Sequence, residues 1–148
     1  MIDEVGLEAY LEGVISSEMS PRSPPALLRA HAVISRSWLL AMLEGGTTRQ
    51  RSHWTAPDNT GIVERIVCYY REDHTAFDVC AEDHCQRYQG VSRTTTQEAV
   101  DAVTATRALA LTADGAVCDA RFSKACGGRA ELFSSARGDP HLAYLHSS

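Results

Sequence analysis

The stretch "SPPALLRAHAVISRSWLLAMLEGG", residues 23–46, decides the fold because it predicts the clearest helix in the chain. Ser23 followed by Pro24 is typical of an N-cap and a proline in the first helical turn. Gly45 and Gly46 then stop the pattern, as glycines do at helix C-termini. Between these limits the side chains that recur at helical intervals are Leu27, His31, Ile34, Trp38, Ala41 and Met42. We therefore predict a long helix that ends at Glu44.

The segments on either side of this helix have weaker patterns. Apolar side chains at helical spacing predict a short amphipathic helix over residues 4–15. The stretch "ISSEMSPRSPP" that follows is rich in serine and proline, which predicts a loop. Residues 45–60 are typical of a flexible connection, and residues 62–70, "IVERIVCYY", are compatible with either a strand or a short helix.

Two further signals lie in the second half of the chain. Thr95 and Glu98 have the spacing of a capping box, which predicts a helix that runs to about Arg107. Apolar runs on both sides of Asp114-Gly115 predict a β-hairpin. The 148 residues are the length of one ordinary domain. We therefore expect one α+β domain over residues 1–148, with a long helix, further helices and a small antiparallel sheet.

Charge and hydropathy exclude several classes of protein. The 14 basic and 19 acidic residues give a net charge of −5, and no basic cluster favours nucleic-acid binding. The N-terminus has acidic residues where a signal peptide needs positive charge, so we expect no signal peptide in this sequence. No apolar run approaches the ~20 residues that span a bilayer, so we expect no membrane span. A neutral or weakly basic polymer such as a glycan remains compatible with this charge.

The stretch "HTAFDVCAEDHC", residues 74–85, gathers four side chains that can bind a metal. These are His74, Cys80, His84 and Cys85, and Cys and His are the ligands that structural zinc sites use. Acidic residues around them could orient the ligands through hydrogen bonds. The spacing fits no standard zinc finger. A small disulfide loop between the two cysteines, with solvated histidines, is an equally good interpretation of the spacing.

Glu18 lies where the first helix is expected to give way to a loop, beside two serines and Met19. A carboxyl group half covered by apolar neighbours can serve as a general acid. The alternative is a surface residue or a helix cap, because acidic residues are common on surfaces.

The cysteines outside the metal-like stretch leave other possibilities open. The chain has five cysteines, an odd number that argues against a fully paired disulfide framework. Cys126, in "FSKACGGRAE", could be a nucleophile if a neighbour stabilised its thiolate, or a small buried residue at a turn. A pairing of Cys68 with Cys118 is not decided by the sequence.

Four stretches, in this order, resemble the domain of stage II sporulation protein D, also called the SpoIID/LytB or amidase-enhancer domain. The family's pattern is Glu-Met, then Ala-x-x-x-Arg on a helix, then Cys-x-x-x-His-Cys-Gln, then Ser-x-x-Cys-Gly-Gly, and it is specific as a set. The matching stretches are "YLEGVISSEM" (10–19), "LLRAHAVISRSWLL" (27–40), "FDVCAEDHCQRYQG" (77–90) and "AVDAVTATRALALTADGAVCDARFSKACGG" (99–128).

The resemblance implies an extracytoplasmic lytic transglycosylase that cleaves the glycan strands of bacterial peptidoglycan. The family's catalytic glutamate matches Glu18, which would protonate the glycosidic oxygen and then act as base while the 6-hydroxyl of the sugar attacks. The product would carry a 1,6-anhydro end, and one carboxylic acid would suffice where most glycoside hydrolases use a pair. Some family members are described as enhancers of a cell-wall amidase, so a non-catalytic wall-binding module is the alternative.

The resemblance also implies a set of further site residues. A zinc ion in one family branch is bound at positions that match His74, Cys80, His84 and Cys85, which would make a closed structural site. The residues expected to line or shape a cleft are Arg36, Gln86, Tyr88, Ser123, Cys126, Gly127 and Gly128. Arg36 could bind glycan carboxylates or hold Glu18; the alternatives are a helix-surface salt bridge for Arg36 and core packing for Tyr88.

This chain departs from the family pattern at two places. The stretch "SPRSPP" replaces an apolar, Trp-containing turn after Glu-Met, and Phe122 stands where an aromatic residue with a hydroxyl is often seen. These departures leave room for the non-catalytic alternative.

Overall fold

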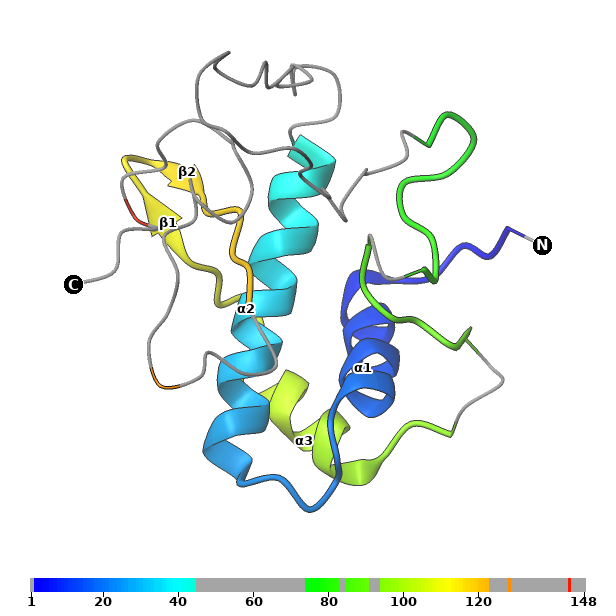
Figure 1. Ribbon diagram of the computed structural model, residues 1–148, viewed down its shortest axis with the longest axis vertical. Coiled ribbons are helices and arrows are strands. Elements are labelled where there is room, and N and C mark those ends of the chain that lie inside the picture. The colour runs from blue at the N-terminus through cyan, green and yellow to red at the C-terminus, as the bar shows by residue number, and fades with distance from the viewer. Residues whose placement is uncertain are drawn as a thin grey trace, which may run out of the picture.

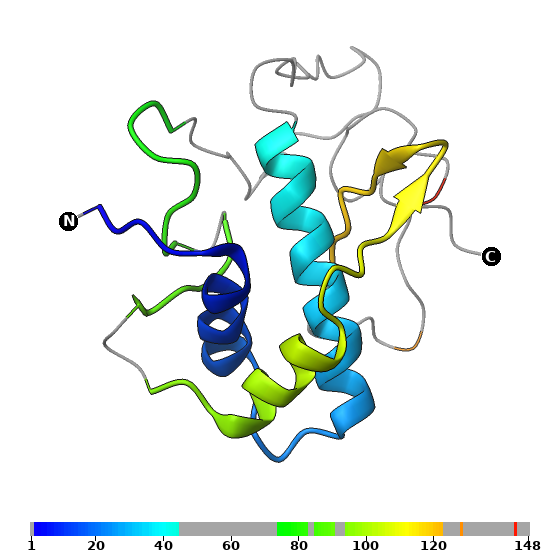
Figure 2. The same ribbon diagram turned by 180° about the vertical axis from the view of Figure 1, so that it is seen from behind.

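The computed structural model describes residues 2–44, 74–82, 85–90 and 94–122, together with Gly128 and Tyr144. Its elements follow one another as α1 (Leu7–Glu18), α2 (Pro25–Glu44), α3 (Gln97–Ala105), β1 (Thr112–Ala113) and β2 (Ala116–Val117). The long α2 forms the centre, with α1 on one side and the hairpin on the other (Figures 1 and 2). α3 packs against both α1 and α2. The predicted α+β class, with a long helix and a small antiparallel sheet, is confirmed.

α1 begins three residues later and ends three residues later than the sequence predicts. Its first turn carries Glu8, a charge that the positive end of the helix dipole favours. The helix continues through the two serines that suggest a loop because their hydroxyls bond back to the preceding turn. Ser16 Oγ donates to the Glu12 carbonyl at 2.7 Å, and Ser17 Oγ donates to the Gly13 carbonyl at 2.8 Å. Glu18 is therefore the last residue of a helix.

α2 follows the prediction closely, since it starts at Pro25 and ends at Glu44. The carbonyl of Pro24 accepts hydrogen bonds from the N–H groups of Leu27 and Leu28, which closes the first turn. Among the described helices α2 alone has the length and hydropathy of a membrane span, but 50% of that window is buried inside the fold. Such burial is typical of a core helix, and one such helix is weak evidence for a span.

α3 and the hairpin also follow their sequence signals. The N-cap of α3 is Thr96, whose Oγ1 accepts from the Ala99 N–H at 3.3 Å, so the predicted box at Thr95 is one residue too early. β1 and β2 pair antiparallel around a turn in which Asp114 and Gly115 both have positive φ, 51° and 80°. Positive φ at both central positions is the conformation that an Asp-Gly turn favours, so the predicted hairpin is confirmed.

The core is formed where the three helices meet. Its buried side chains are Tyr10, Leu11, Val14, Ile15, Leu28, Ala32, Trp38, Leu39, Met42, Ala99, Ala102 and Val103. The hairpin is joined to α2 through Ser37, whose hydroxyl accepts from the Leu111 N–H at 2.8 Å. Residues 62–70, for which the sequence leaves strand and helix open, lie outside the described residues.

Candidate functional site

Glu18 lies at the C-terminal end of α1, where its side chain is mostly covered but not sealed. The side chain is 17% exposed, so part of it is open to solvent or a ligand. α1 ends here because Met19 has extended backbone angles and its N–H closes the last turn onto the Ile15 carbonyl. A partly covered carboxyl group at a helix end is the environment that the sequence predicts for Glu18.

Each oxygen of Glu18 is held from a different part of the chain. Oε1 accepts a hydrogen bond from the backbone N–H of Arg87 at 3.0 Å, and Oε2 lies 3.1 Å from Nε2 of His31. His31 lies on α2 and is almost fully buried, with 3% of its surface exposed. Two partners on opposite oxygens restrict the rotation of the carboxyl group, so Glu18 has one defined orientation.

An aromatic side chain lies beside this pair. The rings of His31 and Phe122 meet edge to face, with centroids 4.5 Å apart and an interplanar angle of 83°. Phe122 is exposed, so it adds an apolar surface near the acid. Phe122 has no hydroxyl, and its ring is fixed to the site by packing on His31.

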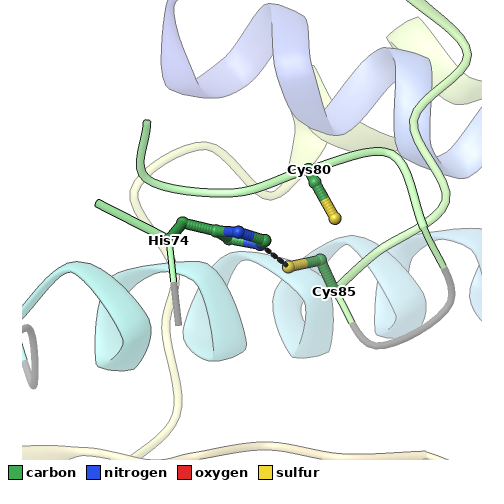
Figure 3. A group of neighbouring side chains, drawn as sticks. All are labelled: His74, Cys80 and Cys85. Atoms are coloured by element: carbon green, nitrogen blue, oxygen red, sulfur yellow. Dashed lines mark hydrogen bonds between the residues drawn. The ribbon is translucent and has the colours of Figure 1, made fainter. Parts of the chain in front are cut away.

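Three of the four predicted metal ligands converge in the described part of the chain. The side chains of His74, Cys80 and Cys85 point toward one another (Figure 3), and their ligand atoms all lie within 4.8 Å of one another. Nε2 of His74 is 3.4 Å from Sγ of Cys85. Tetrahedral zinc with its usual bond lengths places nitrogen and sulfur ligands about 3.6 Å apart, so the spacing fits. The two sulfur atoms are not joined by a disulfide.

The local backbone also suits metal-bound thiolates. The N–H of Glu82 donates to Sγ of Cys80 at 3.3 Å, and the Cys85 N–H donates to the Glu82 carbonyl at 3.0 Å. An N–H that points at a thiolate stabilises its charge, as the outer partners of metal ligands do. The predicted fourth ligand, His84, lies outside the described residues.

The cysteine-containing loop is connected to Glu18 through the two residues after Cys85. Gln86 is buried, and its Nε2 donates to the Ser35 carbonyl on α2 at 3.2 Å. Its Oε1 is buried, and no residue in the described ranges forms a hydrogen bond with it. The next residue, Arg87, supplies the N–H that binds Glu18. The candidate metal ligands and the candidate acid are therefore parts of one continuous arrangement.

Tyr10 lies within electrostatic reach of both groups. Burial raises the pKa of its phenol, and the nearby charges of Cys85 and Glu18 raise it further. Its hydroxyl is buried and has no hydrogen-bond partner among the described residues. Burial, reinforced by these neighbouring charges, therefore keeps the phenol protonated.

Arg36 has a different set of partners from those that the resemblance implies. Its guanidinium is buried and binds both carboxylate oxygens of Glu8, at 3.1 Å and 2.7 Å. It also donates to the carbonyls of Leu109 at 3.0 Å and Val103 at 3.5 Å. These contacts tie α2 to the start of α1, to α3 and to the segment after α3, and Glu18 is not among them. A role of Arg36 in glycan binding stays a prediction.

Tyr88 packs beside the same helix. Its ring lies 4.9 Å from the ring of Tyr10, centroid to centroid, and against the backbone of Gly13. The side chain is half-buried against the core cluster, which is the packing alternative that the sequence leaves open. Of the glycine turn expected to shape a cleft, Gly128 is exposed with φ 92°, and Ser123, Cys126 and Gly127 lie outside the described residues.

The sequence patterns alone do not reveal three of these contacts. His31 fits the apolar stripe of α2, which hides its role as the partner of Glu18. Arg87 takes part through its backbone, which no side-chain motif reports. Glu8 resembles an ordinary acidic residue in a first helical turn. The short loop between the two helices is the sequence feature that could have identified His31. A short loop places the start of α2 opposite the end of α1, and so brings His31 near Glu18.

Comparison with protein-family models finds one match, to SpoIID, Stage II sporulation protein, over residues 1–112. This range contains Glu18, the described metal-ligand candidates and the three helices of the described residues. Comparison with curated proteins and with solved structures finds no match.

Proposed function

Because the chain belongs to the SpoIID family, whose members are stage II sporulation proteins, we propose that it is a lytic transglycosylase that cleaves peptidoglycan glycan strands. Family membership itself indicates a role at the cell wall or in sporulation. The observation that carries the finer proposal is Glu18, a carboxyl group 17% exposed with each oxygen held by a separate partner. An acid that must first give and then take a proton benefits from such a fixed orientation.

The proposed reaction uses this one carboxyl group twice. Glu18 gives its proton to the glycosidic oxygen as the bond from that oxygen to C1 breaks, and positive charge develops on the sugar. The resulting carboxylate then takes the proton of the 6-hydroxyl, whose oxygen bonds to C1 and closes the 1,6-anhydro ring. The departing strand keeps the first proton, so Glu18 ends in its starting state and no water is consumed.

The partners of Glu18 support its charged intermediate form. An N–H directed at a carboxylate oxygen stabilises negative charge, and the Arg87 N–H takes this position at Oε1. The exposed ring of Phe122 provides an apolar surface near the carboxyl group, against which a sugar ring could pack. The substrate is then a glycan strand, and the activity is extracytoplasmic because peptidoglycan lies outside the membrane.

The proposal includes a structural zinc ion bound by His74, Cys80 and Cys85, with His84 as the predicted fourth ligand. The convergence of the three donor atoms within 4.8 Å supports it. Zinc with four protein ligands has no open position for water, so the ion would hold the loop together and take no part in the chemistry. The two residues after Cys85 would then reach Ser35 and Glu18 from a fixed base.

Digestion of purified glycan strands free of stem peptides tests the function. Mass spectrometry of the products should show 1,6-anhydromuramyl ends with the wild-type protein. Glu18→Gln should lower the rate by about 10²- to 10⁴-fold, the usual contribution of a general acid. Glu12→Gln, the same substitution on the same helix, is the matched control and should retain activity.

Three outcomes would replace the proposal. No anhydro product from the wild-type protein would favour a wall-binding or amidase-enhancing module. Full activity in Glu18→Gln would show that Glu18 is not the general acid of the reaction. Loss of activity in Cys126→Ser but not in Glu18→Gln would favour a cysteine hydrolase.

A further inference from the structure

His31 is placed as a partner for Glu18 more closely than packing alone requires. It is 97% buried, it lies on the inner face of α2, and its Nε2 is directed at Oε2 of Glu18 from 3.1 Å. An imidazole is rarely buried to this extent without a partner for its nitrogen atoms. The structure supplies Glu18 as that partner.

The two oxygens of Glu18 differ in what they can do. Oε1 faces the N–H of Arg87, which only donates, so Oε1 acts as an acceptor in both charge states of the acid. An oxygen that carries a proton still has a lone pair for the Arg87 N–H, so the proton of the neutral acid can lie on Oε1, while Oε2 faces His31. Nε2 of a neutral imidazole is an acceptor in one tautomer and a donor in the other. In the tautomer that carries its proton on Nε2, His31 can donate to Oε2 both when Glu18 is protonated on Oε1 and when Glu18 is ionised.

We propose that His31 is a positioning residue that holds Oε2 of Glu18 in place through both halves of the reaction. The idea rests on the proposed function, because it assigns His31 a task in the proton transfers of Glu18. When Glu18 carries its proton on Oε1, the Nε2–H of His31 donates to Oε2 and leaves the O–H group free to turn toward the glycosidic oxygen. When Glu18 is ionised, His31 donates to it and keeps the carboxylate from turning away from the 6-hydroxyl.

The surroundings of His31 fix its own ring. The edge-to-face contact with Phe122 sets one side of the imidazole. Ser35 lies one helical turn after His31, and its carbonyl holds Gln86, the residue before Arg87. The same face of α2 therefore carries His31, which contacts Oε2, and the Ser35 carbonyl, which holds the residue before Arg87. Both oxygens of Glu18 are thus positioned by groups that depend on α2.

Two substitutions separate the hydrogen bond from the packing. His31→Gln keeps a nitrogen and an oxygen at the reach of Nε2 but loses the ring that packs on Phe122. His31→Phe keeps a ring against Phe122 but has no group that can bond Glu18. We expect His31→Gln to retain most of the wild-type kcat, and His31→Phe to lower kcat by about 10- to 100-fold with KM nearly unchanged.

The reverse order, with His31→Phe active and His31→Gln inactive, would overturn the proposal and leave His31 as a packing residue. Thermal unfolding identifies a variant that fails to fold, and His31→Leu then replaces His31→Phe because it has a smaller side chain without a polar atom. If the wild-type protein releases no anhydro product, the proposed function fails. That failure is distinguishable from a failure of the His31 proposal, which depends on the relative kcat values of His31→Gln and His31→Phe.

A second measurement does not depend on activity. In protein labelled with ¹⁵N in histidine, the imidazole resonances of His31 report its tautomer and hydrogen bonding. We expect Glu18→Ala to shift the Nε2 resonance of His31, with Glu12→Ala as the control that leaves it in place. An unchanged resonance in Glu18→Ala would overturn the proposal whether or not glycan strands are cleaved.

Discussion

The ring of Tyr88 lies directly against Gly13 on α1. A Cβ atom built on Gly13 would come within 2.6 Å of Cε2 and 2.9 Å of Cδ2 of this ring. Contacts this short force either the ring or the helix to move. The absence of a side chain at position 13 therefore allows the loop after Cys85 to pack closely on α1.

Gly13→Ala should destabilise the fold although alanine is the better helix former. The substitution gains about 1 kcal/mol of helix propensity but meets an overpacking cost of about 1–3 kcal/mol. We expect a net loss of about 1 kcal/mol in the free energy of unfolding, measured by urea denaturation. Tyr88→Leu should reverse the sign of the Gly13→Ala effect, because the smaller side chain leaves room for the methyl group. An equal loss in both backgrounds would contradict this explanation.

Glu8→Ala should be among the most damaging substitutions on the outer turns of the helices. It leaves the buried guanidinium of Arg36 without its charged partner, and a broken buried pair of this kind costs about 3–5 kcal/mol. Because Glu8 is 24% exposed and water can partly replace it, we expect a cost at or below the lower end of that range. Glu4→Ala, an exposed acidic position just before the same helix, should change the free energy of unfolding by less than about 0.5 kcal/mol.

Metal removal should loosen the segment that holds Glu18. The purified protein should contain about one zinc ion per chain, and a chelator should reduce thermal stability, because a metal bound only by the folded state stabilises it. Amide exchange at Arg87 should become faster without metal, since its N–H lies two residues after Cys85. Cys80→Ser should lower the metal content, whereas Cys118→Ser, at a buried thiol on β2's C-terminal side, should not. A metal content unaffected by Cys80→Ser would refute the site.

Tyr10→Phe should be tolerated near neutral pH and should improve stability in alkali. Its hydroxyl has no hydrogen-bond partner in the described part of the chain, so its removal leaves no described group unpaired. The raised pKa of Tyr10 means that the unfolded chain loses the phenolic proton first, at its ordinary value of 10.0. The free energy of unfolding of the wild-type protein therefore falls above about pH 10, by up to about 1.4 kcal/mol per pH unit from this group. Denaturation curves at several pH values should show that the free energy of unfolding falls less steeply with pH in Tyr10→Phe than in the wild-type protein. A large loss near neutral pH would show that the hydroxyl has a partner.

The sequence predicts those parts of the fold that depend on neighbouring residues. The limits of α2 and the turn at Asp114-Gly115 follow from local backbone preferences, and both are found in the structure. The N-cap of α3 is misplaced by one residue because consecutive threonines offer equivalent caps. The end of α1 is missed because Ser16 and Ser17 satisfy their hydroxyls within the helix, an arrangement that composition does not reveal.

The contacts of the candidate site depend on how α1 and α2 are paired, which local patterns do not report. A short connection makes the two helices antiparallel neighbours. The end of α1 then faces the start of α2, and Glu18 meets His31, while the start of α1 faces the later turns of α2, and Glu8 meets Arg36. The expectation that Arg36 could hold Glu18 overlooks this order along the two helices. The candidate metal ligands are easier to find, because they lie in one stretch of sequence.

The contact between Glu18 and Arg87 has a consequence for how substitutions at position 87 are tolerated. Only the backbone N–H of Arg87 touches the acid, and its side chain is exposed. Any residue that keeps an N–H preserves this contact, so position 87 is free to vary, with proline as the exception. A scan of all amino acids at this position should therefore show that nearly every substitution is tolerated and that proline is not. This pattern identifies a backbone contact, which a search for essential side chains would miss.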